Sequence, residues 1–182
     1  MNNRKLSYCL HFVIALTAVV ACTLAGCNNN SCTDNRSSLL LCGFYNNEAK
    51  PTSITLDSIE MGGVGAPYDS LLLGVADHTS KLYLPLRSRD TSTSFFIHYC
   101  QKELDYSWLN DTITLRYTSE PYFVSQECGA IYRYHVKEMT YTRHLVDSVA
   151  LLDSLINNLD VEKMKIMFRT ASDTEVQTTS LP

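Results

Sequence analysis

The sequence predicts an all-β fold, a single β-sandwich that follows an exported leader. Short runs of apolar residues alternate with polar ones at a period of two, which is the pattern of half-buried strands. Clusters of Gly, Pro, Asn and Asp separate these runs at short intervals, as turns do in sandwiches and barrels. Charged residues make up 19% of the chain, against about 25% in an average soluble domain, and Thr, Ser and Tyr fill the polar positions.

The first half of the chain is expected to hold four strands. They are residues 38–45, 53–61, 81–86 and 94–100. In 53–61 the apolar positions change parity after Leu56 and resume at Ile59, which predicts a β-bulge near Asp57 and Ser58. In 81–86 the leucines are expected to point inward and Lys81, Tyr83 and Pro85 outward. Pro85 indicates an edge strand, or a position that faces away from its neighbour, because proline cannot donate to a ladder.

Four further strands are expected in the second half, at residues 111–117, 131–141, 145–152 and 163–169. The apolar spacing from Leu145 to Leu159 is also compatible with a helix; we predict a strand over 145–152 and a loop through Asn157 and Asn158. Together these strands predict one immunoglobulin/transthyretin-like β-sandwich over residues 38–170, followed by a disordered tail at 171–182.

The N-terminal segment has the features of a lipoprotein signal peptide. Residues 1–26 carry Arg4 and Lys5, then a long apolar run without acidic residues, as secretory leaders do. The sequence Leu24-Ala25-Gly26-Cys27 is similar to a bacterial lipobox. It predicts cleavage between Gly26 and Cys27 and acylation of Cys27 with chains such as palmitate, with residues 27–37 as a tether. The alternative is an uncleaved transmembrane helix.

Charge and the tether predict where the protein resides. Removing Arg4 and Lys5 from 15 basic residues leaves 13 against 19 acidic ones, a net charge of −6, which argues against a nucleic-acid partner. No acidic run follows Cys27. We therefore expect a lipid-anchored outer-membrane protein on the periplasmic face, not one displayed on the cell surface.

Seven cysteines divide into three groups. Cys9 and Cys22 belong to the leader, and Cys27 is the lipid site. The remaining four predict two disulfides in an oxidising compartment, with three possible connectivities. Cys42 and Cys100 both lie in strand-like runs, whereas Cys32 and Cys128 lie in turn-like contexts, so the pairs Cys42–Cys100 and Cys32–Cys128 are predicted. No C-x-x-C or H-x-x-x-H spacing occurs, and no metal site or cofactor is expected.

No enzyme is predicted. His144, Asp147 and Ser148 would supply the residue types of a hydrolase triad, but such triads depend on geometry and not on closeness in sequence. A G-x-S-x-G nucleophile motif does not occur. His98 and His135 lie in expected strands, where a surface or hydrogen-bonded histidine is the ordinary outcome.

The loop at 104–110 is a candidate ligand contact. Tyr106 and Trp108 lie there beside two acidic residues, a combination that can stack a sugar ring. The interpretation given more weight is a loop anchor packed over the core, because most tryptophans are largely buried. Asp-Ser/Thr-aliphatic triplets are similar to an O-glycosylation pattern of periplasmic proteins, with Ser70 or Thr112 as the first candidates; the same pairs are also plain turn chemistry.

Several short motifs recur in the order found in a known family. They are the lipobox, Cys32, Gly43-Phe44-Tyr45, Leu84-Pro85-Leu86, residues 113–117, Glu127-Cys128-Gly129 and residues 145–149. Together they resemble the lipoproteins of domain-of-unknown-function family 6452 of Bacteroidota-type bacteria. The resemblance implies a small secreted β-rich domain with no established activity and a structural role for Cys32 and Cys128. We expect a non-enzymatic envelope lipoprotein that binds a protein partner or has a structural role, or alternatively a carbohydrate-binding or adhesin-like module that uses the Trp108 loop.

Overall fold

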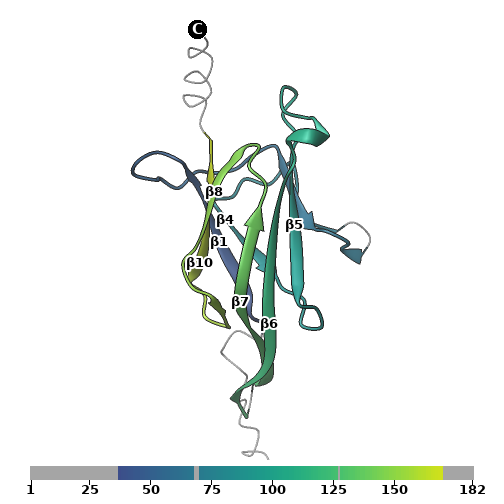
Figure 1. Ribbon diagram of the computed structural model, residues 1–182, viewed down its shortest axis with the longest axis vertical. Helices are drawn as coiled ribbons and strands as arrows, with labels where there is room; N and C mark the ends of the chain where they lie inside the picture. The colour runs from purple at the N-terminus through teal and green to yellow at the C-terminus, as the bar shows by residue number, and fades with distance from the viewer. Residues whose placement is uncertain (1–36, 68–69, 127, 170–182) are drawn as a thin grey trace, which may run out of the picture. The chain divides into compact units, whose positions relative to one another are not determined.

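The computed structural model describes residues 37–67, 70–126 and 128–169, which form two β-sheets (Figure 1). The four-stranded sheet has the order β4 (Lys81–Pro85), β1 (Leu39–Asn46), β10 (Glu162–Phe168) and β8 (Val146–Leu151). The six-stranded sheet has the order β3 (Leu71–Leu73), β2 (Ile59–Gly63), β5 (Ser92–Tyr99), β6 (Asp111–Ser125), β7 (Gly129–Tyr141) and β9 (Leu155–Ile156). Among the paired strands only β1 and β10 run parallel.

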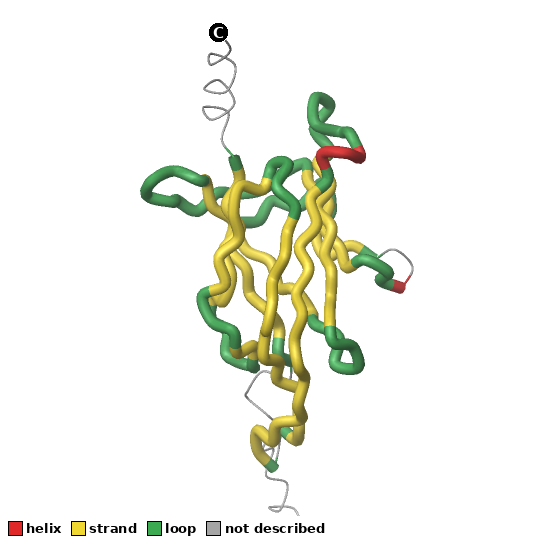
Figure 2. Tube along the Cα trace, viewed as in Figure 1, coloured by secondary structure: helices red, strands yellow, loops and turns green. Residues whose placement is uncertain are grey.

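Loops and a short 3₁₀-helix, η2 (Ser107–Leu109), join the strands (Figure 2). The described residues contain no α-helix, so the predicted all-β sandwich is confirmed. No helix among them is long and apolar enough to cross a membrane. The predicted leader at 1–26, nearly all of the tether and the tail at 171–182 lie outside the described residues.

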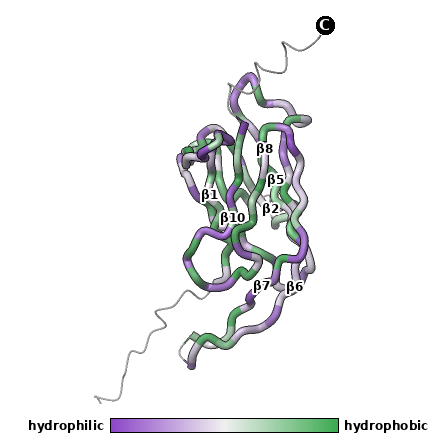
Figure 3. The backbone as a smooth tube through the Cα atoms, turned by 60° about the vertical axis from the view of Figure 1, so that its left-hand side comes forward, coloured by the Kyte–Doolittle hydropathy of each residue, from purple (hydrophilic) through white to green (hydrophobic). Residues whose placement is uncertain are grey.

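The core lies between the two sheets. Its fully buried side chains come from alternate positions of the strands, and they include Phe44, Ile166, Phe95 and Ile113. Figure 3 shows the matching alternation of apolar and hydrophilic residues along the chain. Phe44 and Phe168 meet edge to face at 6.1 Å between ring centroids, a geometry that aromatic pairs favour.

The edge position predicted from Pro85 is confirmed. β4 has only β1 as a strand neighbour, and Pro85 pairs with Leu39 at the end of the ladder. Leu84 points into the core and Tyr83 is exposed, as the alternation predicts. The strand at 145–152, which the sequence left open to a helical reading, is β8, and it pairs with β10.

The parity change in the segment 53–61 marks a passage between sheets and not a β-bulge. Ser53 forms an isolated bridge with Tyr45 of the four-stranded sheet, whereas β2 begins only at Ile59 in the other sheet. Between them Ser58 has a φ of 53°, a left-handed conformation that few non-glycine residues adopt. This turn lets both halves direct apolar residues into the same core.

The β6–β7 hairpin is longer than the sequence predicted. Strands were expected at 111–117 and 131–141, but β6 continues to Ser125 and β7 starts at Gly129 (Figure 1). β5 pairs with β6 only as far as Arg116. The outer part of the hairpin therefore has no β5 neighbour, and Tyr132 is 46% exposed, although it shares a face with the buried Tyr134.

Candidate functional site

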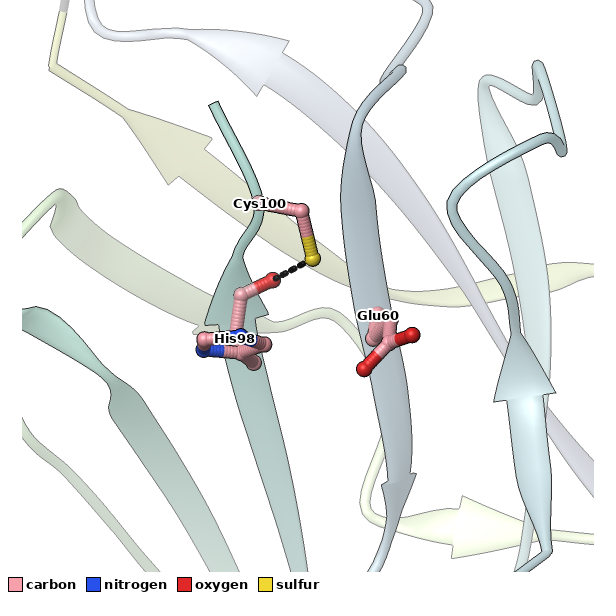
Figure 4. Close-up of side chains that lie close together, drawn as sticks. All are labelled: Glu60, His98 and Cys100. Carbon is pink, nitrogen blue, oxygen red and sulfur yellow. Dashed lines mark hydrogen bonds between the residues drawn. The ribbon is translucent and has the colours of Figure 1, made fainter. Parts of the chain in front are cut away.

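Three side chains of different chemistry gather on the outer face of the six-stranded sheet. Glu60 on β2 is paired with His98 on β5, and Cys100 follows the end of β5 (Figure 4). The neighbouring residues in sequence point into the core, so these three face the other way. One ligand atom from each lies within 4.8 Å of the other two. All three residues are half-buried.

The following loop, residues 101–110, fixes the His98 ring from two sides. Nδ1 lies 2.9 Å from Asn110 Oδ1, and Nε2 lies 3.6 Å from Asp105 Oδ1. The loop is itself held by short backbone hydrogen bonds, and Leu104 packs against the core. Donation from Nδ1 to Asn110 leaves Nε2 as the nitrogen with the available lone pair.

Cys100 is a free thiol. Partial burial, together with the negative charges of Glu60 and Asp105, raises the pKa of Cys100. Its Sγ lies 3.9 Å from the carbonyl oxygen of His98. The backbone N–H donates to Ser58 O at 2.8 Å, which keeps the residue beside the start of β2. The thiol is thus held close to two carboxylates.

The predicted Cys42–Cys100 disulfide is wrong. Both cysteines are free. Cys42 lies in the core on β1, where its thiol contacts Leu82 O at 3.2 Å and burial raises its pKa to about 12. Cys100 belongs to the outer face of the other sheet. A strand-like context says nothing about which face a cysteine occupies, and that inference therefore failed.

Cys128, at the tip of the β6–β7 hairpin, is disulfide-bonded. The other two described cysteines, Cys42 and Cys100, are free. Cys32, the predicted partner, lies outside the described residues, and the Cys32–Cys128 pairing stays a prediction.

Tyr106 and Trp108 form an exposed aromatic pair. Their rings stack at 4.3 Å between centroids with an interplanar angle of 22°. Trp108 is 66% exposed and Tyr106 is 44% exposed. The interpretation of Trp108 as an anchor packed over the core is therefore wrong. Tyr106 caps the 3₁₀ turn that contains Trp108, and none of the residues of this turn is buried.

The same loop borders a cleft at this end of the sandwich. The cleft has a volume of about 600 Å³, within the usual range for small-ligand sites. Gln101 and Leu104 contribute to it from the loop, and His144 and Arg169 contribute from segments beside the four-stranded sheet. Its walls are mainly apolar, and Tyr99 and Phe168 form part of them.

His144 and Asp147, two residues of the candidate hydrolase triad, contact other groups. His144 Nδ1 lies 2.8 Å from the carbonyl oxygen of Asn110. Asp147 instead contacts Arg143, with 3.4 Å between Nη2 and Oδ1, and lies 4.0 Å from Arg169 Nε. His135 lies 3.1 Å from Glu120 on the β6–β7 hairpin, and its proximity lowers the pKa of Glu120.

Asp111, the first residue of β6, is fully buried and has a structural role. Its carboxylate accepts hydrogen bonds from the hydroxyls of Tyr99 and Thr142. Three backbone N–H groups, at residues 144–146, also donate to it. Burial would raise the pKa of Asp111, but these hydrogen bonds outweigh it and hold the pKa below its usual value.

The two O-glycosylation candidates have different accessibility. Ser70 is exposed just before β3, whereas Thr112 is half-buried within β6 and its backbone N–H donates to Thr142 Oγ1. Ser70 is therefore the more accessible of the two hydroxyls.

Sequence reasoning missed Glu60, His98 and Cys100 as members of one cluster. The spacings C-x-x-C and H-x-x-x-H are typical of metal ligands in zinc knuckles and on helices. On a strand, the relevant signal is a period of two, which places His98 and Cys100 on one face. The third member depends on the cross-strand pairing of Glu60 with His98, which no local pattern reveals.

The fold and this site define a two-sheet β-sandwich domain that carries a mixed histidine, thiol and carboxylate cluster beside an exposed aromatic pair. The sequence model of a family of unknown function, DUF6452, matches residues 45–168, more than half of the chain. The chain belongs to this family. No curated protein and no solved structure matches it.

Proposed function

We propose that the protein is a non-enzymatic binding module of the bacterial cell envelope, held at the periplasmic face of the outer membrane by lipid on Cys27. The lipobox-like sequence at residues 24–27 and the polar tether after it support the anchor. The resemblance to Bacteroidota-type lipoproteins supports the same location. In this proposal the sandwich presents its Tyr106–Trp108 loop to a carbohydrate.

The exposure of Trp108 carries the ligand part of the proposal. A tryptophan side chain has on the order of 150–250 Å² of surface, and two-thirds of this residue is left in water. Covering about 100 Å² of it with the apolar C–H face of a sugar would contribute about 2.5 kcal/mol. The stack on Tyr106 holds the indole of Trp108 in one orientation, so binding adds little entropic cost for ordering this side chain.

Polar groups around the pair suit a hydroxylated ligand. Asp105 precedes Tyr106, and its side chain is 59% exposed. Gln101 lies at the rim of the adjacent cleft. Carboxylate and amide groups beside an aromatic face can accept and donate the hydrogen bonds that orient a sugar ring.

The β6–β7 hairpin favours a protein partner as a second candidate. Pro121 pairs with Tyr132 and Phe123 pairs with Ala130, so these four residues share one face. Phe123 is 65% exposed, and this face continues the core side of β7 past the buried Tyr134. An exposed apolar surface of this kind is typical of protein interfaces.

Binding of envelope glycans by the full-length protein tests the carbohydrate proposal. We expect retention on an array of bacterial envelope polysaccharides, and Trp108→Ala should weaken it by about 50- to 100-fold, the equivalent of about 2.5 kcal/mol. Phe123→Ala is the matched control, since it removes an equally exposed aromatic residue at the other end of β6. Equal binding by wild type and Trp108→Ala would reject the role of this loop.

Cross-linked capture from native envelopes separates the two candidates. Recovery of one dominant protein that Phe123→Ala loses and Trp108→Ala retains would favour the hairpin surface over the aromatic pair. Fractionation of the native membranes tests the anchor: Cys27→Ala should release the protein from the membrane fraction, and unchanged retention would contradict the lipid attachment.

A further inference from the structure

We propose that Glu60, His98 and Cys100 bind a divalent transition-metal ion of the zinc type, with Asp105 as the neighbouring fourth group. The proposal is independent of the carbohydrate-binding function. It starts from the close approach of the three side chains, whose ligand atoms lie within 4.8 Å of one another (Figure 4). The donors are one thiol, one imidazole and one carboxylate, a combination that borderline-soft ions such as Zn²⁺ accept.

The strand pairing makes the cluster a property of the fold. Glu60 and His98 lie directly opposite one another across β2 and β5, where side chains are about 5 Å apart at Cβ. Cys100 lies two residues beyond His98 and is held beside β2 by its hydrogen bond to Ser58. Two paired strands thus supply Glu60 and His98, and the residue that directly follows β5 supplies the third ligand.

Only a small contraction is needed to form a coordination shell. Ligand atoms around tetrahedral Zn²⁺, at roughly 2.0–2.3 Å from the ion, are about 3.5 Å apart. Because all three ligand atoms lie within 4.8 Å of one another, no pair has to close by more than about 1.3 Å, which rotation of the Glu60 and Cys100 side chains can provide. Asp105 Oδ1 already lies 3.6 Å from His98 Nε2.

Asn110 supplies the support that histidine ligands commonly have. Its Oδ1 accepts from Nδ1 at 2.9 Å, which fixes the ring and directs the lone pair to Nε2. Asp105 Oδ1 lies 3.6 Å from Nε2. Asn110 is thus a positioning residue, and the metal would bind at Nε2.

The charges around the thiol fit a cation. Glu60 and Asp105 place negative charge beside the Cys100 thiol. A bound divalent ion would neutralise these carboxylates and take the thiolate directly. Binding would release the thiol proton to solvent, so the ion would replace a proton at Sγ.

Cobalt(II) and zinc binding by the full-length protein in detergent tests the proposal. With Co²⁺ we expect the ultraviolet charge-transfer absorption of a cobalt–thiolate bond, and Zn²⁺ should displace it. Cys100→Ser should abolish this absorption, and His98→Ala should weaken Zn²⁺ binding by more than about 100-fold. Asn110→Ala should weaken it by about 10- to 100-fold, as loss of a group that orients a ligand does.

Two controls keep the result specific. His135→Ala removes a histidine of the same sheet that contacts a carboxylate, Glu120, instead of a cysteine. This variant should bind Zn²⁺ as tightly as the wild type. Circular dichroism of each variant verifies the fold. The proposal is overturned by absence of the cobalt–thiolate band in the wild type, or by a band that persists in Cys100→Ser, since other cysteines would then be the ligands.

Discussion

Replacement of Asp111 by Asn is expected to lower the free energy of unfolding by about 2–4 kcal/mol. Oδ2 accepts from the Tyr99 hydroxyl and from the N–H groups of Leu145 and Val146. Oδ1 accepts from Thr142 Oγ1 and from the N–H of His144. An asparagine can keep only one of these two acceptor positions.

The magnitude follows from the bonds that remain. With its oxygen at the position of Oδ2, the asparagine amide can donate to Thr142 Oγ1, but it leaves the His144 N–H without an acceptor. An unsatisfied backbone donor costs about 1–3 kcal/mol. The three remaining bonds lose their charge assistance, which roughly doubles the strength of a hydrogen bond. Asp111→Ala loses all five acceptor contacts and should cost about 3–5 kcal/mol.

Acid should reduce the difference between wild type and Asp111→Asn. The folded pKa of Asp111 lies below its unfolded value, which is about 3.9. The stability contributed by the charge is therefore fully present above the unfolded pKa and is lost as the pH falls through the folded pKa. Wild type should lose more stability than the variant between pH 5 and pH 2.

Urea unfolding, followed by circular dichroism at neutral and acidic pH, measures both effects. Asp147→Asn is the control, since its carboxylate contacts Arg143 and Arg169 near the surface, and it should cost less than about 1 kcal/mol. A cost for Asp111→Asn equal to that of Asp147→Asn would refute the assignment of Asp111 as the buried acceptor that joins these segments.

Three further outcomes are expected. In the native protein, a thiol-alkylating reagent should modify Cys100 and leave Cys42 intact, because Cys42 is buried with a pKa of about 12; peptide mass spectrometry showing both modified would contradict this. Phe44→Ala should lower the free energy of unfolding in urea by about 3–5 kcal/mol, and Tyr83→Ala by less than about 1 kcal/mol. Equal losses would contradict the assignment of Phe44 to the core. Ser58→Val should cost about 1–2 kcal/mol in thermal unfolding while Ser58→Gly stays near wild type, and tolerance of Val would argue against the left-handed turn.

Local patterns were sufficient to predict the strands whose two faces differ clearly. β4, β10 and the start of β6 were found because apolar residues alternate there, whereas the apolar spacing around β8 also fitted a helix. The proline at position 85 also indicated the edge position of its strand correctly, because proline has no N–H to donate to a ladder. These features depend on neighbouring residues alone, so a single sequence contains them.

Features that depend on non-local pairing were missed or wrong. The outer hairpin of β6 and β7 interrupts the simple alternation, since Tyr122 and Phe123 are adjacent aromatic residues. The predicted disulfide between Cys42 and Cys100 was wrong because the sequence does not show which sheet each strand belongs to. For the same reason, the pairing of Glu60 with His98 could not be predicted. The exposure of Trp108 departs from the usual burial of tryptophan, because a 3₁₀ turn directs it outward.

Two consecutive residues, Asn110 and Asp111, connect the parts of this end of the sandwich. The Asn110 side chain orients His98, and its carbonyl oxygen contacts His144. Asp111 binds the segment that leads into β8 of the other sheet. An ion at His98 would therefore bind next to the hydrogen bonds that join the two sheets at this end. The outer β6–β7 hairpin shares none of these contacts, so substitution of Phe123 should leave carbohydrate binding at Trp108 unchanged.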